Sequence, residues 1–231
     1  MKNYFTYIVC FFLVGSFITC NQENVREESQ VIDNQKESQQ NTITHQSQSA
    51  PKTLTDDVDK ADKKVDVIEQ IRANYAATIQ KLDNGELQKI TKEFECDNDP
   101  VTGALSRYMN GDEVVFLEYS IGGEHGWRSQ KIYFKDGEPY FVFAEDGTWY
   151  FGGPDGTDDT GENTVDDITE TRYYLENGKV IRKLSKKYLI ESWKAKPDVS
   201  KIPNQTVTDG LGEAYPDAGE IPNWLKGKAG C

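Results

Sequence analysis

The residues that come nearest to a catalytic arrangement are Glu124 and His125, in the Gly-rich segment that runs from Gly122 to Trp127. A carboxylate beside an imidazole on a flexible turn is a pairing from which enzymes build a general base. The part of the chain that we expect to fold contains no second histidine, and no residue is spaced as a partner for His125. Nucleophile-elbow, zinc-protease, phosphate-loop and Cys-x-x-Cys motifs are missing from the sequence. We predict no catalytic residue, and the sequence leans away from an enzyme.

Aromatic residues are concentrated between positions 108 and 151. Most of them alternate with polar residues and are explained as the buried face of a sheet. Trp127, Trp149 and Tyr150 instead flank Gly-rich turns, where rigid amphipathic rings are suited to carbohydrate or peptide binding. The alternative is that these three rings cap the ends of the sheet. They are the candidate ligand-binding residues.

An acidic, Gly-rich loop is expected over residues 146–167. Its oxygen-bearing side chains are of the type that calcium prefers: Asp155, Asp158, Asp159, Glu162, Asn163, Asp166 and Asp167. Their spacing does not match an EF-hand loop, so a solvated insertion is the favoured interpretation. We therefore predict no metal site and no cofactor.

The N-terminus has the pattern of an export signal. Lys2 is followed by an apolar run of about 15 residues, which is shorter than the roughly 20 residues that a membrane-spanning helix needs. The run ends at Phe17-Ile18-Thr19-Cys20, after which the chain becomes polar. This junction resembles the lipobox of bacterial lipoproteins, although Leu is usual at the position of Phe17 and Gly, Ala or Ser at the position of Thr19. The alternative is an ordinary secretory signal with an incidental thiol at Cys20.

The lipobox resemblance implies that residues 1–19 are removed and that Cys20 is acylated, which anchors the protein to a membrane. Asn21 and Gln22 lack the Asp that retains some lipoproteins at the inner membrane, so the outer membrane is the expected location. Cys96 and Cys231 then remain, and in an oxidising envelope they can form a disulfide. The alternative is two free thiols.

Residues 20–55 are polar and carry no aromatic residue, so we expect a disordered tether. From about residue 58 to 82, apolar residues recur every three or four positions, which predicts one amphipathic helix that ends near Asn84-Gly85. The period then changes to two. Strands are predicted over residues 87–96, 103–109, 112–121, 127–135, 139–145, 168–176 and 179–188.

Hairpin signals separate several of these strands: Asn110-Gly111, Asp136-Gly137 and Asn177-Gly178. The predicted fold is α+β, with one N-terminal helix packed on an antiparallel meander of six or seven strands over residues 56–190. Residues 191–231 are expected to form an irregular tail, which Trp193, Trp224 and Leu225 either pin across the domain or leave frayed. The succession of lipobox, polar tether, helix and aromatic hairpins resembles that of Bacteroidetes-type envelope lipoproteins, a likeness that implies no activity.

The net charge of −13 disfavours binding to nucleic acid, because an acidic surface repels phosphate. The functional prediction is a membrane-anchored envelope lipoprotein that binds a ligand, such as a glycan, or an envelope protein partner without catalysis. Two alternatives stay open: a hydrolase of polysaccharide or peptide that uses carboxylates of the acidic loop, and a purely structural envelope component.

Overall fold

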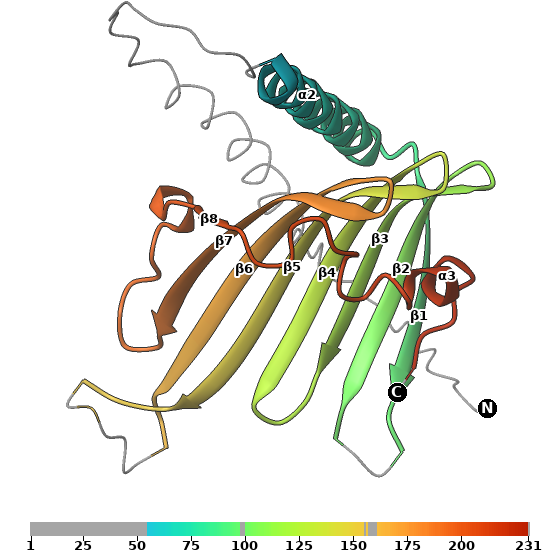
Figure 1. The fold of residues 1–231 in the computed structure, drawn as a ribbon. Coiled ribbons are helices and arrows are strands. Elements are labelled where there is room, and N and C mark those ends of the chain that lie inside the picture. Colours follow the sequence, from blue (N-terminus) through green and yellow to red (C-terminus); the bar gives the residue numbers. More distant parts are fainter. Residues whose placement is uncertain (1–54, 98–99, 155, 157–160, 231) are drawn as a thin grey trace, which may run out of the picture.

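The computed structural model describes residues 55–97, 100–154, 156 and 161–230. The expected signal peptide, Cys20, nearly all of the expected tether and Cys231 lie outside these residues. The described chain forms a helix followed by one antiparallel sheet, in agreement with the predicted α+β class (Figure 1). The elements are α2 (Thr55–Asp83), β1 (Gln88–Glu95), β2 (Thr102–Asn110), β3 (Glu113–Gly122), β4 (Gly126–Lys135), β5 (Glu138–Phe151), β6 (Thr164–Glu176), β7 (Lys179–Glu191), the short 3-10 helix η1 (Val199–Lys201), β8 (Gln205–Val207) and α3 (Ile221–Leu225).

The sheet is a meander of eight strands whose order in space follows their order in the chain. The seven predicted strands are confirmed, and the expected count of six or seven is wrong because β8 adds an eighth. β8 has three residues and pairs with β7 through Ser185 and Gln205. So short a strand shows no alternation that a sequence pattern could reveal.

The hairpin turns explain the meander. Asp136 and Gly137 both have positive φ (52° and 78°), as do Asn177 and Gly178 (52° and 73°). Positive φ at both central residues characterises a type I′ turn, whose twist matches that of the flanking strands. Between β2 and β3 the positive φ falls on Gly111 alone (63°). The predicted tight turns are therefore present, and each one makes its two strands antiparallel neighbours.

Helix α2 covers one end of one sheet face, which we call the helix face. Its apolar stripe packs on aromatic rings of the sheet, and Tyr75, 2% exposed, is central to this packing. The Tyr75 ring lies 4.9 Å from that of Tyr133 and 5.5 Å from that of Phe141, both in edge-to-face geometry. The predicted helix and the second half of its stripe are thus confirmed. Among the described helices, none combines the length and the apolar composition needed to cross a membrane.

The opposite sheet face is covered by residues 208–230, which we call the C-terminal strap. In Figure 1 this segment crosses the front of the sheet. Tyr215, Ile221 and Trp224 are buried against apolar residues of several strands, including Leu117 and Ile132. Of the two outcomes expected for the tail, the pinned one is therefore present, with Trp224 among its anchors. The domain is thus a sheet with a helix on one face and a strap on the other.

Candidate functional site

The register of the strands decides which predicted ligand-binding residues share a face. Trp127 of β4 pairs with Gly147 of β5, and side chains two positions apart on a strand point to the same side. Trp127 and Trp149 therefore both lie on the helix face, beyond the end that α2 covers. Tyr150 is one residue further along and points to the opposite face, where it is 50% exposed. The three predicted rings do not form one site.

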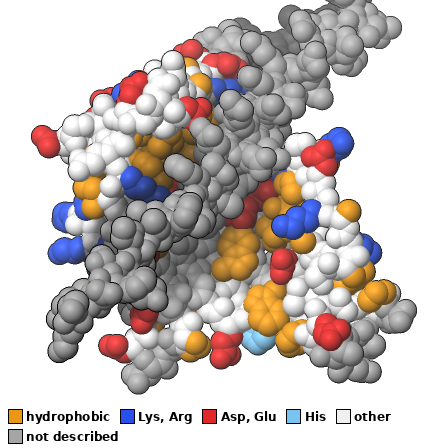
Figure 2. Space-filling model, turned by 180° about the vertical axis from the view of Figure 1, so that it is seen from behind, with side chains coloured by type: hydrophobic (Ala, Val, Ile, Leu, Met, Phe, Trp, Pro, Cys, Tyr) orange, Lys and Arg blue, Asp and Glu red, His pale blue; other side chains and the backbone are white. Residues whose placement is uncertain are grey.

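Phe151 takes the place expected of Tyr150. It returns to the helix face, is 54% exposed, and its ring lies 5.3 Å from that of Trp149. The ring of His125 lies 4.7 Å from that of Trp149, and the Trp149 amide donates a hydrogen bond of 3.1 Å to the His125 carbonyl. Figure 2 shows hydrophobic side chains gathered at this lower end of the sheet. The signal for Phe151 was present in the alternation of β5.

The Trp127 indole packs over Gly147, where the lack of a side chain leaves room for the ring. A Cβ on Gly147 would come within 2.3 Å of Cε2 and 2.4 Å of Nε1 of the indole, closer than real atoms approach. The indole therefore rests against the Gly147 backbone and is half-buried. Rings that lie over glycine on a neighbouring strand recur in sheets as a stabilising device. Here the device also fixes the orientation of a partly exposed aromatic ring.

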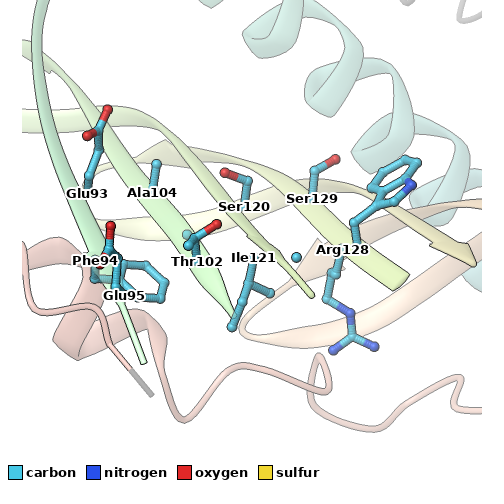
Figure 3. A pocket seen from close by; sticks show the side chains of 12 residues that line it. Glu93, Phe94, Glu95, Thr102, Ala104, Ser120, Ile121, Arg128 and Ser129 are labelled. Carbon is cyan, nitrogen blue, oxygen red and sulfur yellow. The ribbon is translucent and has the colours of Figure 1, made fainter. Parts of the chain in front are cut away.

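Trp127 lines one side of an open groove of about 540 Å³ on the ends of β1 to β4. Glu93 and Glu95 of the edge strand β1 line the groove at its other end. The floor between them consists of small residues, which lets a ligand approach the sheet closely: Thr102, Gly103, Ala104, Ser120, Gly122 and Ser129. Figure 3 shows Glu93, Ala104, Ser120 and Ser129 pointing to the same side of the sheet.

Arg128 also lines the groove, but its guanidinium group is directed away from it (Figure 3). On the opposite face, Nε of Arg128 donates a 2.5 Å hydrogen bond to Asp146, and Nη1 lies 3.8 Å from Asp217 of the strap. The hydrogen bond to Asp146 raises the pKa of the Arg128 guanidinium above its usual value. The side chains that remain on the groove side carry two carboxylates and several hydroxyls.

A charge cluster on the helix face of β6 and β7 could not be seen in the sequence. Glu170 accepts bonds of 3.1 Å from both Arg172 and Lys186 and one of 3.0 Å from the Tyr188 hydroxyl. Glu170, Arg172 and Lys186 are each at most 5% exposed. Burial, followed by the charges of Glu170 and Glu145, raises the pKa of Tyr188 far above its ordinary value. Because buried charges are costly unless they are paired, the cluster is best explained as a structural network.

The expected loop over residues 146–167 is wrong at both ends. Residues 146–151 extend β5 and residues 164–167 begin β6, so the loop is confined to residues 152–163. The alternation of side chains between the two faces of β5 continues through Gly147, Trp149 and Phe151. The acidic residues clustered after this point in the sequence obscured that pattern. Asp146 and Asp167 are ion-paired, with Arg128 and Lys187 respectively. Asp155, Asp158 and Asp159 lie outside the described residues. Within the described part, no three His, Cys, Asp or Glu side chains are grouped so that they could hold a metal.

Cys96 follows β1 and is disulfide-bonded. Its predicted partner Cys231 lies outside the described residues, so the pairing itself stays a prediction. The strap does reach this edge of the sheet, because Lys92 of β1 donates a 2.9 Å hydrogen bond to the carbonyl of Ala229.

Compared with known proteins, the chain matches no family model, no curated protein and no solved structure.

Proposed function

We propose that this protein is an envelope lipoprotein, anchored through an acylated Cys20, whose domain binds glycan chains in the groove between β1 and β4 without cleaving them. The observation that carries the proposal is the position of Trp127. Its indole is held against Gly147 at the end of a groove that has small, hydroxyl-bearing residues as its floor. The expected location is the outer membrane, as the lipobox-like junction and the polar residues after it favour.

The groove has the chemistry that sugars require. A pyranose ring has an apolar face, which packs on an indole, and a rim of hydroxyls, which need hydrogen-bond partners. The hydroxyls of Ser120, Ser129 and Thr102 can donate or accept, and the carboxylates of Glu93 and Glu95 accept. A fixed aromatic ring binds with little loss of rotamer freedom, which otherwise reduces affinity. The open, shallow shape suits a chain that passes through the groove.

Binding is better supported than hydrolysis. A glycosidase needs one carboxylic acid that stays protonated, which usually requires burial. Glu93 and Glu95 are both exposed on an edge strand. Of the carboxylates expected for a loop-based hydrolase, Asp146 and Asp167 face the strap side and are ion-paired. The alternative of an enzyme therefore gains no support from this groove.

The test is isothermal titration of the full mature chain, purified in detergent, against a panel of neutral, amino and acidic oligosaccharides. We expect Trp127→Ala to weaken binding roughly tenfold, the effect of losing about 1.4 kcal/mol of ring stacking. Gly147→Ala should weaken glycan binding as much as Trp127→Ala does. This variant keeps the indole, but the new Cβ forces the indole out of its position.

Tyr150→Ala is the control, since it removes an exposed aromatic ring from the opposite face of the same end of the sheet. Thermal unfolding of each variant separates loss of binding from loss of fold. If the panel binds but all three variants bind alike, the groove is not the site. If no glycan binds, the domain is a protein-binding or structural envelope component, and crosslinking in the intact envelope should identify its neighbour. Release of shorter oligosaccharides during the titration would instead favour the alternative that the protein is a hydrolase.

A further inference from the structure

We propose that the ligand of this groove is an oligosaccharide with free amino groups, which are held at the Glu93–Glu95 end while a sugar ring packs on Trp127. This inference rests on the proposed glycan-binding function and narrows it to one chemical class. It follows from the length of the groove and from the charges that line it.

The length follows from the strand register. Glu95 pairs with Thr102, Thr102 with Gly122, and Gly122 with Trp127, so the two ends of the groove stand in one transverse row. Three inter-strand steps separate Glu95 from Trp127, which amounts to about 14 Å at the usual strand spacing. A single sugar ring cannot contact both ends. A ligand that uses the carboxylates and the indole together is therefore an oligosaccharide that lies across the strands.

The charge is unbalanced on the groove side. Glu93 and Glu95 are two residues apart, so both carboxylates lie on the helix face. The cations of β1 and the cation that lines the groove are engaged elsewhere. Lys92 bonds to Ala229 of the strap, Arg128 to Asp146 on the other face, and Nζ of Lys89 lies 3.7 Å from Glu118. Two exposed carboxylates with no cation among the groove-facing side chains attract an ammonium group and repel uronic acids and phosphates.

The floor suits the same ligand. Ala104, Ser120 and Ser129 form the next transverse row, in line with Glu93. Their small side chains leave room for a ring above the sheet, and the two serine hydroxyls can bond to sugar hydroxyls or to a neutral amine. An amino sugar thus finds an apolar surface, hydroxyl partners and counter-charges in one groove.

The experiment compares three probes of equal length by titration calorimetry: oligomers of glucosamine, the same oligomers with every amine acetylated, and oligomers of galacturonic acid. We expect the glucosamine oligomer to bind about fivefold more tightly than its acetylated form, the effect of two exposed ion pairs. The galacturonic acid oligomer should bind weakest. The preference for the free amine should fall with added salt, which screens exposed charges.

The double variant Glu93→Gln/Glu95→Gln should abolish the preference, so that the free and the acetylated oligomer bind with equal affinity. Glu138→Gln/Glu213→Gln removes the same number of exposed charges outside the groove and should leave the preference intact. Equal binding of free and acetylated oligomers, both sensitive to Trp127→Ala, would overturn the inference and leave the proposed function standing. If Trp127→Ala leaves binding of the glucosamine oligomer unchanged, the inference is also overturned, because the oligomer is then attracted by net charge alone. If none of the three probes binds but another oligosaccharide of the panel does, the inference fails and the proposed function stands; if no oligosaccharide of the panel binds, both fail.

Discussion

Trp224 of the C-terminal strap stacks on Tyr119 of β3, with ring centroids 4.5 Å apart and planes inclined by 19°. Trp224 is 5% exposed and belongs to the same apolar cluster as Leu117 and Ile132. Tyr119 lies in turn 6.1 Å from the ring of Phe94 on β1. One indole thus joins the end of the chain to the first strands of the sheet.

Replacement of Trp224 by Ala should lower the free energy of unfolding by about 3–5 kcal/mol, because a large buried ring is lost and a cavity remains. Urea denaturation followed by circular dichroism measures the change. Leu211→Ala, on the same segment but 37% exposed, should stay within about 0.5 kcal/mol of the unaltered protein. Equal midpoints for the two variants would contradict the role given to the strap.

Glu170→Gln should be severely destabilising, by about 3–5 kcal/mol, because it leaves Arg172 and Lys186 buried without their counter-charge. Adding Arg172→Met to that variant should recover part of the loss, since one uncompensated charge is then removed. A double-mutant cycle by denaturant unfolding measures the coupling. Purely additive effects would show that the network is not a unit.

Stability should also fall in alkaline solution, partly through Tyr140. Burial raises the pKa of Tyr140 to about 12, against 10.0 for the free side chain, although the bond with Thr78 opposes the shift. Between these values the folded state retains a proton that the unfolded state has lost, so the stabilisation is complete below pH 10 and disappears as pH rises toward 12. Two pKa units correspond to about 2.7 kcal/mol.

The measurement for Tyr140 is the free energy of unfolding from pH 9 to 12, with phenolate absorbance as a parallel reading. Tyr140→Phe should reduce the slope by about one proton in this range, relative to the unaltered chain. It should also cost about 1 kcal/mol at neutral pH through loss of the 3.3 Å bond with Thr78. If the unfolding free energy of Tyr140→Phe depends on pH as steeply as that of the unaltered chain, a group other than Tyr140 titrates in this range.

If Cys96 pairs with Cys231 as we expect, Cys96→Ser and Cys231→Ser should lower stability equally, by about 5 kcal/mol on the loop-entropy estimate. The double variant should be no worse than either single one. Non-reducing peptide mapping by mass spectrometry identifies the linkage directly. A linkage of Cys96 to any other cysteine would refute the pairing.

Cys20→Ser should release the protein from the membrane fraction, because acyl chains supply about 0.8 kcal/mol of membrane binding per buried methylene. Intact mass of the detergent-extracted protein should show cleavage before Cys20 and the added acyl groups. A membrane-bound Cys20→Ser variant would argue for a different anchor, and an unmodified soluble chain for ordinary secretion.

Local patterns were enough to predict the helix and the seven longer strands. The apolar stripe with Ile68, Ile71 and Tyr75 predicted α2, and residue pairs such as Asn177-Gly178 predicted the turns of the meander. These features depend on residues that are close together in the sequence. The brief strand β8 depends on pairing with β7 and left no signal of its own.

The site was predictable only in part, because it depends on register. Trp127 and Trp149 lie together at one end of the sheet, but Tyr150 falls on the other face, since side chains alternate along β5. Glu93 and Trp127 are 34 residues apart in the chain and line opposite ends of one groove, separated by three pairings of strands. No spacing within the sequence could have shown that the small residues of three strands line up between them.

The strap also has a consequence for how the protein is made. Each strand pairs with the one synthesised before it, so the sheet can grow in step with the emerging chain and contact order within it is low. Contacts from the strap back to β1 and β2, such as that between Arg107 and the carbonyl of Leu225, come from residues that are synthesised after all eight strands. A chain that lacks the strap would therefore have a complete sheet with a bare apolar face. Such an exposed apolar face is a feature that quality-control proteases should recognise.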